Sequence, residues 1–321
     1  MNGLPLVSII CLCYNHEKFL EEALLSVINQ DYPNKEIIVV DDFSSDSSVE
    51  KIKKIIKEYP EIIFLPNPHN VGNCLSFNQA FEKSKGEYII DFSTDDVMLP
   101  NKIKKQVEKF LTLSERYGVV YSDAEIVNEK GELLGYHHRG TKRVSFHPEG
   151  DIFKYVVWKY FICPPTMMIR RTTLERTGGY NTELAYEDFN FWVESARSFY
   201  YGFIPEALVK RRIVGNSLSS AFYRKDTLNV FQTTLQVLQK AYTLCKSEEE
   251  YRMFVDRVRF ELKHAVMMEN YSIAKSYREL LLKTNSYDWV SKFFLFISTK
   301  KIPVFWLYDF LLRYKGVYKN R

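Results

Sequence analysis

The sequence predicts an α/β fold in which a mainly parallel sheet is flanked by helices and followed by a helical C-terminal region. Two observations support this prediction. The first hundred of the 321 residues alternate short apolar runs with amphipathic helical patterns, which is typical of βαβ units. From about residue 222 onward, helical patterns follow one another without strand signals. We therefore expect a sheet-containing domain over 1–221 and a helical region over 222–321.

Five apolar runs are expected to form strands of the sheet. They lie near 6–12, 36–40, 62–65, 88–92 and 118–121. Between the first two runs, a helical pattern places its apolar side chains on one face and its charged ones on the other, so this helix should pack on the sheet. Further helices are expected at about 46–58, 73–84 and 187–198, and a hairpin turn is expected at 129–132.

The composition argues against nucleic acid as the main partner. The chain is 46% hydrophobic and 26% charged, which is ordinary for a soluble globular protein. Its net charge is only +4, and the 44 basic residues are interleaved with 40 acidic ones. A nucleic-acid-binding surface would require the basic residues to be concentrated in a stripe.

Cysteine usage and the amino terminus indicate a cytosolic protein. Five cysteines stand at positions 11, 13, 74, 163 and 245, without the paired spacing of a zinc site, so we expect buried, reduced thiols. The first residues lack the basic start and apolar stretch of a signal peptide. No uninterrupted apolar run is long enough to span a bilayer.

Acidic pairs follow two of the predicted strands. Asp41 and Asp42 end one apolar run, Asp95 and Asp96 follow another, and a third pair opens the helix expected from residue 187. Any one of these pairs is more often a turn or a helix cap. Because the carboxyl ends of parallel strands are where open α/β sheets bind ligands, the repeated placement favours a site. Two adjacent carboxylates are tolerated best beside a divalent cation.

The first strand is not followed by a glycine-rich phosphate loop. The segment Cys13-Tyr14-Asn15-His16-Glu17 matches neither of the usual phosphate-binding patterns. If the sheet binds a nucleotide, a divalent ion held by Asp95 and Asp96 would neutralise the phosphates. A tyrosine at the end of the first strand could stack on a base, and Asp42 could accept a hydrogen bond from a base N–H.

Taken together, these motifs resemble the family 2 inverting glycosyltransferases of the GT-A fold. The resemblance covers about the first 220 residues. It rests on Pro5 to Ile10 with Tyr14-Asn15, Glu36 to Asp42, Asn70, Gly72 and Asn78, Tyr88 to Asp96, Gly178-Gly179-Tyr180, Glu187-Asp188, and Arg211-Arg212 with 216–220. Many members carry a further aspartate two residues before the acidic pair, where this chain has Ser93.

The resemblance implies a Rossmann-like GT-A domain and a role for each matching residue. It implies nucleotide binding by Pro5, Tyr14, Asn15, Glu17, Asp42, Asn70, Gly72, Asn78, Asp95, Arg211 and Arg212. It implies coordination of Mn²⁺ or Mg²⁺ by Asp96 with Asp95. Asp188, accompanied by Glu187, would be the general base that takes the proton from the acceptor hydroxyl.

The function implied is transfer of a sugar, with inversion, from a nucleoside-diphosphate sugar to an acceptor hydroxyl. We expect a UDP-sugar donor and a glycan or lipid-linked acceptor, in the assembly of a surface polysaccharide or another glycan. Two alternatives stay open. A sugar nucleotidyltransferase has a similar sheet but requires a glycine-rich basic loop after the first strand. An inactive scaffold would bind the nucleotide sugar without turnover.

The segment 287–321 combines aromatic and basic residues in two helical patterns separated by Pro303. One interpretation places both helices on the anionic inner face of the plasma membrane, as a peripheral contact. The other packs their aromatic side chains on the main domain or on a second subunit, which would make a homo-oligomer. Both kinds of helix share this pattern, so the sequence leaves the two open.

Overall fold

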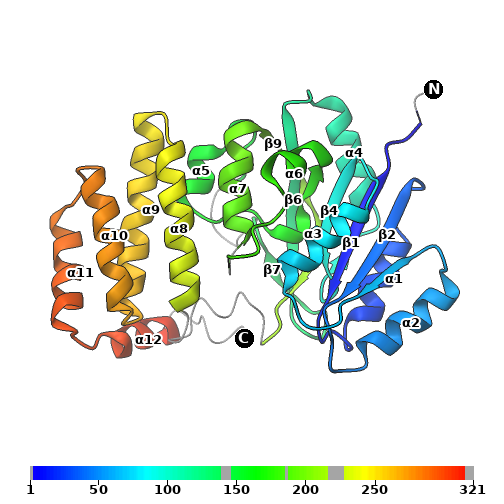
Figure 1. Ribbon diagram of the computed structural model, residues 1–321, viewed down its shortest axis with the longest axis horizontal. Coiled ribbons are helices and arrows are strands. Elements are labelled where there is room, and N and C mark those ends of the chain that lie inside the picture. Colours follow the sequence, from blue (N-terminus) through cyan, green and yellow to red (C-terminus); the bar gives the residue numbers. More distant parts are fainter. Residues whose placement is uncertain (1–2, 139–145, 185–186, 216–227, 315–321) are drawn as a thin grey trace. The chain divides into compact units, whose positions relative to one another are not determined.

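The computed structural model describes residues 3–138, 146–184, 187–215 and 228–314 (Figure 1). The chain divides into two compact units. The first, which we call the sheet unit, consists of Met1–Ile152, Phe161–Thr182 and Glu194–Ile213. The second, which we call the helical unit, consists of Phe153–Tyr160, Glu183–Val193 and Val214–Arg321. The domain boundary expected near residue 221 lies outside the described residues.

The strands in the described residues form one mixed sheet. They are β1 (Val7–Cys13), β2 (Lys35–Asp41), β3 (Ile63–Pro66), β4 (Tyr88–Ser93), β5 (Val97–Met98), β6 (Tyr117–Val127), β7 (Leu133–Tyr136), β8 (Met168–Arg170) and β9 (Tyr200–Arg212). Their order is β3-β2-β1-β4-β8-β6-β9-β5, with β7 paired to β6. The first four strands of this order are parallel. β8 is antiparallel to both β4 and β6, and β9 is parallel to β6.

The predicted α/β fold is confirmed, and the five expected strands correspond to β1, β2, β3, β4 and β6. The expected turn at 129–132 joins β6 to β7 as an antiparallel hairpin. Parallel pairing is confined to the β3-to-β4 part and to β6 with β9, so the sheet is more mixed than expected. The difference arises because β8, only three residues long, inserts between β4 and β6 in the opposite direction.

Amphipathic helices cover the sheet. They are α1 (Leu20–Ile28), α2 (Ser48–Glu58), α3 (Asn73–Lys83), α4 (Lys102–Thr112) and α6 (Arg171–Thr177), with a short 3₁₀ turn, η1 (Pro164–Thr166). Buried side chains of α1, α2 and α4 share one core with alternate residues of β1, such as Ile9 and Cys11. α3 packs against β1 and β2 and buries Phe77 and Ala80 outside that cluster. Because successive strand residues face opposite sides, Ile10 points to this second layer.

The five cysteines are free and buried, as expected for reduced thiols. Cys11 and Cys13 lie on β1, and Cys11 has no exposed surface. Burial raises the pKa of the Cys11 thiol far above its ordinary value, and the neighbouring Asp91 carboxylate raises it further. These thiols therefore act as small core side chains.

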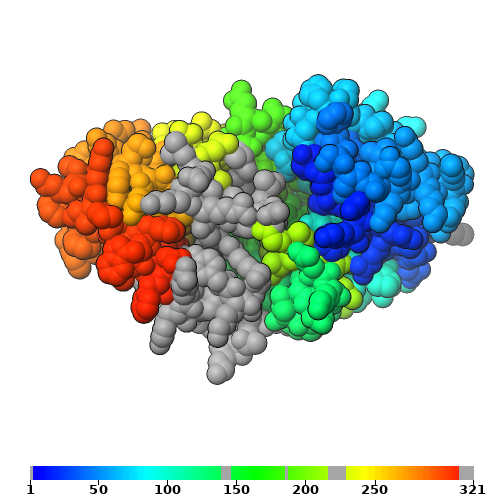
Figure 2. All heavy atoms as spheres, turned by 90° about the horizontal axis from the view of Figure 1, so that it is seen from below, coloured from blue at the N-terminus to red at the C-terminus, as the bar shows by residue number. Residues whose placement is uncertain are grey.

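The helical unit consists mainly of long helices. Its elements are α5 (Phe153–Trp158), the start of α7 (Glu187–Ser198), α8 (Leu228–Leu244), α9 (Glu248–Met267), α10 (Tyr271–Lys283), α11 (Trp289–Lys300) and α12 (Phe305–Tyr314). α8 to α11 run side by side, and α12 lies across their ends (Figure 1). Atoms of α11 and α12 form part of the surface seen in Figure 2. Among the described helices, none is long and apolar enough to cross a bilayer.

Two polar features stabilise α9, a capping box at its start and a buried ion pair further along. Ser247 begins α9 with a capping box, in which its side chain accepts from the Glu250 N–H and the Glu250 side chain accepts in return. Further along α9, Arg257 donates to Glu261 at 2.7 Å, with both side chains buried. The Arg257 guanidinium also lies 3.8 Å from the centre of the Tyr160 ring. The charges are therefore paired where α5 and α9 pack.

Gly86, which precedes β4, should not tolerate a side chain. A Cβ atom at this position would lie 2.3 Å from Ser8 Oγ and 2.5 Å from the Ser8 nitrogen. Backbone atoms cannot yield cheaply, so Gly86→Ala should lower the free energy of unfolding by at least about 2 kcal/mol. Urea unfolding measures this loss. In Gly135→Ala a Cβ atom meets nothing within 4 Å, and this control should change stability by less than about 0.5 kcal/mol.

Candidate functional site

The loops that follow β1 and β2 are locked together. The Asp42 N–H donates to the Cys13 carbonyl at 2.9 Å and so extends the pairing of the two strands by one residue. The Asn15 N–H then donates to Ser44 Oγ at 2.9 Å, and the Ser45 N–H donates to Asn15 Oδ1 at 2.8 Å. Predicted site residues from two strands are thereby brought together at the carboxyl edge of the sheet.

Two aromatic rings are exposed on these loops. Tyr14 follows β1 and is 48% exposed, and Phe43 follows β2 and is 57% exposed. Phe43 has a φ of +65°, in the left-handed region that bulky residues rarely adopt. Strain of this kind persists only where the surroundings impose it, and it is concentrated at ligand-binding sites. The sequence analysis missed Phe43; the only available signal was a large apolar residue inside a polar turn.

The Asp42 carboxylate holds the next loop. It accepts hydrogen bonds from the Val71 N–H at 2.8 Å, the Gly72 N–H at 2.9 Å and the side chain of Asn67 at 2.9 Å. The Asn70 side chain donates to the Asp42 carbonyl at 3.2 Å. Three of the roughly four acceptor positions of this carboxylate are therefore used inside the protein. Asp42, Asn70 and Gly72 lie together, as the sequence predicted.

The acidic pair after β4 is fixed by the end of β9. The Arg212 N–H donates to Asp96 Oδ1 at 2.8 Å, and Arg212 Nε donates to the Asp95 carbonyl at 3.0 Å. Ser93, in the place of the family's further aspartate, donates from its hydroxyl to Asp95 Oδ1. Directly after the pair, β5 runs antiparallel to β9, with Val97 opposite Lys210. This pairing brings the end of β9 beside the acids.

Burial makes the ionised form of the Asp96 carboxyl unfavourable in the folded protein. Its side chain is 5% exposed, and burial raises its pKa well above the usual range. The neighbouring Asp95 carboxylate raises this pKa further, while the Arg212 N–H lowers it only in part. A bound cation would favour the ionised form, and carboxylate oxygens are suitable ligands for Mn²⁺ or Mg²⁺. In the described ranges, no three His, Cys, Asp or Glu side chains surround a metal position, so further ligands would come from phosphate and water.

Arg212 is a structural link at the end of β9. Its guanidinium donates to Glu22 of α1 at 2.7 Å and to the carbonyls of Asn128 and Glu129 at 3.3 and 3.1 Å. It also lies 4.7 Å from the centre of the Phe19 ring. Most of its donors are therefore used within the sheet unit.

His16 connects the ends of β1 and β4, and the sequence analysis gave it no role. His16 Nδ1 lies 2.9 Å from Thr94 Oγ1, and the Thr94 hydroxyl is 3.1 Å from the Leu12 carbonyl. The next residue, Glu17, accepts from the Ser47 N–H at 3.0 Å. The position of His16 directly after Tyr14-Asn15 was the signal that could have identified it as a residue of this edge.

Two predicted residues are placed elsewhere in the sheet unit. Pro5 precedes the amino end of β1, at the opposite edge of the sheet, and its carbonyl accepts from the Tyr32 hydroxyl at 2.6 Å. Asn78 of α3 exchanges hydrogen bonds with the main chain of Tyr180, at 2.8 and 2.9 Å. The structure therefore places Pro5 away from the residues that follow β1, β2 and β4, namely Tyr14, Asn15, Asp42, Asp95 and Asp96, which we call the strand-end group. Asn78 fixes the segment that follows α6.

The predicted catalytic pair begins α7. Glu187 is buried, Asp188 is partly exposed, and both are in the helical unit. Carboxylates in the first turn are favoured by the partial positive charge of the helix amino terminus. Arg211 is partly exposed at the end of β9 in the sheet unit. The remaining predicted segment, 216–220, lies outside the described residues.

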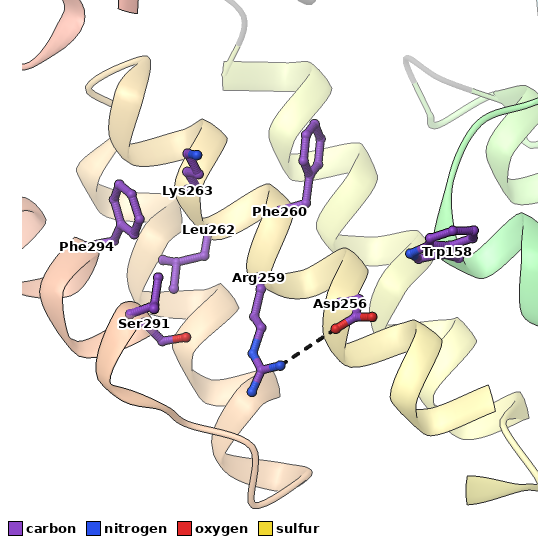
Figure 3. Close-up of a pocket in the computed structure, with 9 residues that line it drawn as sticks. Trp158, Asp256, Arg259, Phe260, Leu262, Lys263, Ser291 and Phe294 are labelled. Carbon is purple, nitrogen blue, oxygen red and sulfur yellow. Dashed lines mark ion pairs between the residues drawn. The ribbon is translucent and has the colours of Figure 1, made fainter. Parts of the chain in front are cut away.

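A groove of about 410 Å³ opens in the helical unit (Figure 3). Its lining residues are Trp158, Asp256, Arg259, Phe260, Leu262, Lys263, Val290, Ser291 and Phe294. Arg259 pairs with Asp256 at 3.6 Å and with Asp288 at 3.1 Å. None of these lining residues is a predicted site residue, so the groove and the strand-end group share no residues.

Comparison with known proteins agrees with this fold. Residues 8–178 match the model of the family described as Glycosyl transferase family 2. A glycosyltransferase of Haemophilus influenzae is 32% identical over 235 residues, which cover 69% of this chain and 70% of that protein. The putative glycosyltransferase EpsE of Bacillus subtilis is 29% identical over 244 residues, covering 74% of this chain and 83% of EpsE.

Solved structures show the same fold at low sequence identity. The mannosyltransferase PcManGT from Pyrobaculum calidifontis, in complex with GDP-Man and Mn²⁺, has a TM-score of 0.61 at 16% identity, covering 94% of this chain and 86% of its own. TarS 1–349 of S. aureus, in complex with UDP-GlcNAc, has a TM-score of 0.60 at 16% identity, covering 92% and 91%. The fold is therefore that of the GT-A class. The chain belongs to the family 2 glycosyltransferases.

Phe43→Gly should stabilise the protein. The left-handed conformation costs a residue with a Cβ atom about 1–2 kcal/mol, and glycine avoids most of this cost. Because glycine also gains freedom in the unfolded chain, the expected net gain is about 1 kcal/mol, seen as a higher melting temperature. Phe43→Ala removes the ring but keeps the strained backbone, and it should not show this gain. Equal melting temperatures for the Gly and Ala variants would contradict the strain.

Proposed function

We propose that this protein is an inverting, metal-dependent glycosyltransferase that moves a sugar from a UDP-sugar to an acceptor hydroxyl. The observation that carries the proposal is the fixed group of polar residues at the carboxyl edge of β1, β2 and β4. There the Asn15–Ser44 contact joins two loops, and Arg212 holds Asp95 and Asp96. An open α/β sheet binds its ligand at this edge.

In this proposal the β1 and β2 loops bind the nucleoside. Tyr14 and Phe43 present exposed rings on neighbouring loops, and either can stack on a base. The remaining acceptor position of Asp42 suits an N–H of uracil. Asn15 Oδ1 accepts from Ser45 and so fixes the loops, and the Asn15 amide NH2 is proposed to donate to the nucleotide. If Phe43 contacts the base, the stabilised Phe43→Gly variant should bind UDP more weakly than wild type.

Asp96 and Asp95 would hold Mn²⁺ or Mg²⁺ together with the donor diphosphate. When bound, the cation offsets the negative charge that develops on the departing diphosphate. The raised pKa of Asp96 supports this assignment, since its ionised carboxylate lacks full compensation from the protein. PcManGT is described in complex with GDP-Man and Mn²⁺, a combination that accords with metal use in this class. Arg211, partly exposed beside Arg212, is proposed to donate to the diphosphate.

Asp188 is proposed as the general base, with Glu187 beside it. An ionised carboxylate in the first turn of α7 would take the proton from the acceptor hydroxyl while that oxygen attacks the anomeric carbon. The C–O bond to the acceptor forms as the bond to the diphosphate breaks on the opposite face, so the configuration inverts. A diphosphate leaves without a proton donor, so one catalytic carboxylate suffices. The acceptor is proposed to be a glycan or a lipid-linked glycan, in surface polysaccharide assembly.

Asp96→Asn should raise the stability of the folded protein and remove its response to Mn²⁺. The folded state raises the Asp96 pKa, so ionisation of this carboxyl destabilises the folded protein once the pH exceeds the unfolded-state value. Asparagine still accepts from the Arg212 N–H but carries no charge. The variant should therefore melt higher than wild type at about pH 8, with a gain that shrinks as the pH falls toward the carboxyl range.

The same variant tests the cation. Mn²⁺ should raise the melting temperature of the UDP-bound wild type, because a ligand that binds only the folded state stabilises it. Asp96→Asn should abolish this increment. A manganese response of equal size in wild type and variant would remove the metal assignment. Glu58→Gln, which removes an exposed carboxylate at the end of α2, should respond like wild type.

Asp188→Asn should abolish transfer while UDP binding persists. The amide cannot accept the acceptor's proton, so turnover should fall by at least about 100-fold, as expected for loss of a general base. UDP release from the UDP-sugar in the presence of acceptor measures turnover, and a thermal shift with UDP and Mn²⁺ measures donor binding. Undiminished turnover would refute the role of Asp188. Loss of both readouts would assign the residue to donor binding instead.

A further inference from the structure

α11 exposes an aromatic face. Trp289, Phe293 and Phe296 follow the helical repeat of four and three residues, and all are exposed, Trp289 to 77%. The opposite face is attached to the helical unit, where Leu295 is buried and Ser298 Oγ donates to the Tyr271 carbonyl at 3.1 Å. The aromatic face therefore belongs to a well-packed helix and is not left over from poor packing.

α12 has the same construction. Trp306, Leu307 and Phe310 are exposed, Trp306 to 68%. The other side is held in place, because the Phe305 N–H donates to Glu269 at 3.0 Å and the Tyr308 ring lies near the His264 ring. Large apolar side chains gathered in this way mark an interaction surface on a folded protein.

Basic residues accompany the aromatic face of α11. Lys292, Lys300 and Lys301 are exposed on or next to α11. Over 287–321 the sequence has seven basic residues, Lys292, Lys300, Lys301, Arg313, Lys315, Lys319 and Arg321, against two acidic ones, Asp288 and Asp309. Asp288 is already paired with Arg259 and caps α11. The two acidic residues of the segment therefore do not balance its seven basic ones.

The groove of the helical unit (Figure 3) is lined on α11 by Val290, Ser291 and Phe294, which lie on a different side of the helix from Trp289, Phe293 and Phe296. Val290, next to Trp289 on α11, lines the groove and is exposed. Phe260 of α9 lines it too and is 59% exposed. Lys263, one turn further along α9, is exposed and lies 5.9 Å from the centre of the Phe294 ring. Rings and a cation therefore also lie around the groove between α9 and α11.

We propose that the exposed faces of α11 and α12 dock the protein on an anionic membrane surface. Tryptophan and phenylalanine side chains interleaved with lysine fit the boundary between headgroups and acyl chains. The basic residues favour an anionic membrane over a second copy of the chain as the binding partner. A twofold dimer through these faces would oppose one basic surface to another, whereas anionic headgroups offset the charge. The inference does not depend on the proposed glycosyl transfer.

Flotation of the full chain with vesicles tests the proposal. The protein should float with phosphatidylcholine vesicles that contain about 30% phosphatidylglycerol, and much less with phosphatidylcholine alone. About 0.5 M salt should weaken binding, because it screens the lysines. Binding should also shift tryptophan fluorescence to shorter wavelength.

Matched variants locate the surface. Replacing Trp289, Phe293 and Phe296 together by serine should lower the vesicle partition coefficient at least tenfold, with an unchanged melting temperature because all three are exposed. Replacing Lys292, Lys300 and Lys301 by glutamate should remove the preference for anionic lipid. As a control, serine at Leu4, Leu111 and Leu133, three exposed leucines of the sheet unit, should leave flotation unchanged.

Three outcomes would overturn the proposal. The first is wild-type protein that stays at the bottom of the gradient with anionic vesicles. The second is an aromatic triple variant that floats as well as wild type. The third is a wild-type dimer, measured by light scattering without lipid, that the aromatic triple variant dissociates; this result would assign the surface to a second copy.

Discussion

The buried carboxylate of Asp96 is the constraint on which the site depends. It lies in the turn between β4 and β5, at 5% exposure beside the carboxylate of Asp95, so two acidic groups meet where water is scarce. Arg212 holds the pair with its main-chain N–H and its guanidinium, yet the Asp96 pKa remains raised. Because the same guanidinium also binds Glu22 and the β6–β7 turn, the acids are tied to α1 and to the hairpin.

The sequence predicted those parts of the fold that repeat a simple pattern. β1, β2 and β4 are continuous apolar runs. In α1 and α2 the apolar residues recur with the helical period, so run length and period identified all five elements. β9 could not be identified in this way, because Pro205 interrupts its apolar pattern. The structure accommodates the interruption with a register shift, in which Ile204 pairs with Ser122 and Ala207 pairs with Asp123. β5 and β8 are too short for any period to appear.

For the site, the sequence identified residue types better than contacts. Asp42, Asn70 and Gly72 were placed in one group, and the structure joins them by hydrogen bonds. The sequence could not reveal that Arg212 is buried, because the five N–H donors of an arginine can bind a ligand or a main-chain carbonyl equally well. Nor could it reveal the backbone of Phe43, since φ depends on the tertiary contacts of the turn.

Two unfavourable features lie at the same edge of an otherwise well-packed sheet. Phe43 keeps a left-handed backbone, and Asp96 keeps a poorly compensated charge, whereas neighbouring β1 and β4 bury relaxed apolar side chains. A fold selected only for stability would have glycine at the first position and a neutral side chain at the second. A bound cation would offset the cost at Asp96, and a ring stacked on Phe43 would add binding energy beside the strained turn. Both features lie at the edge where open α/β sheets bind their ligands, so the proposed site coincides with two local costs in stability.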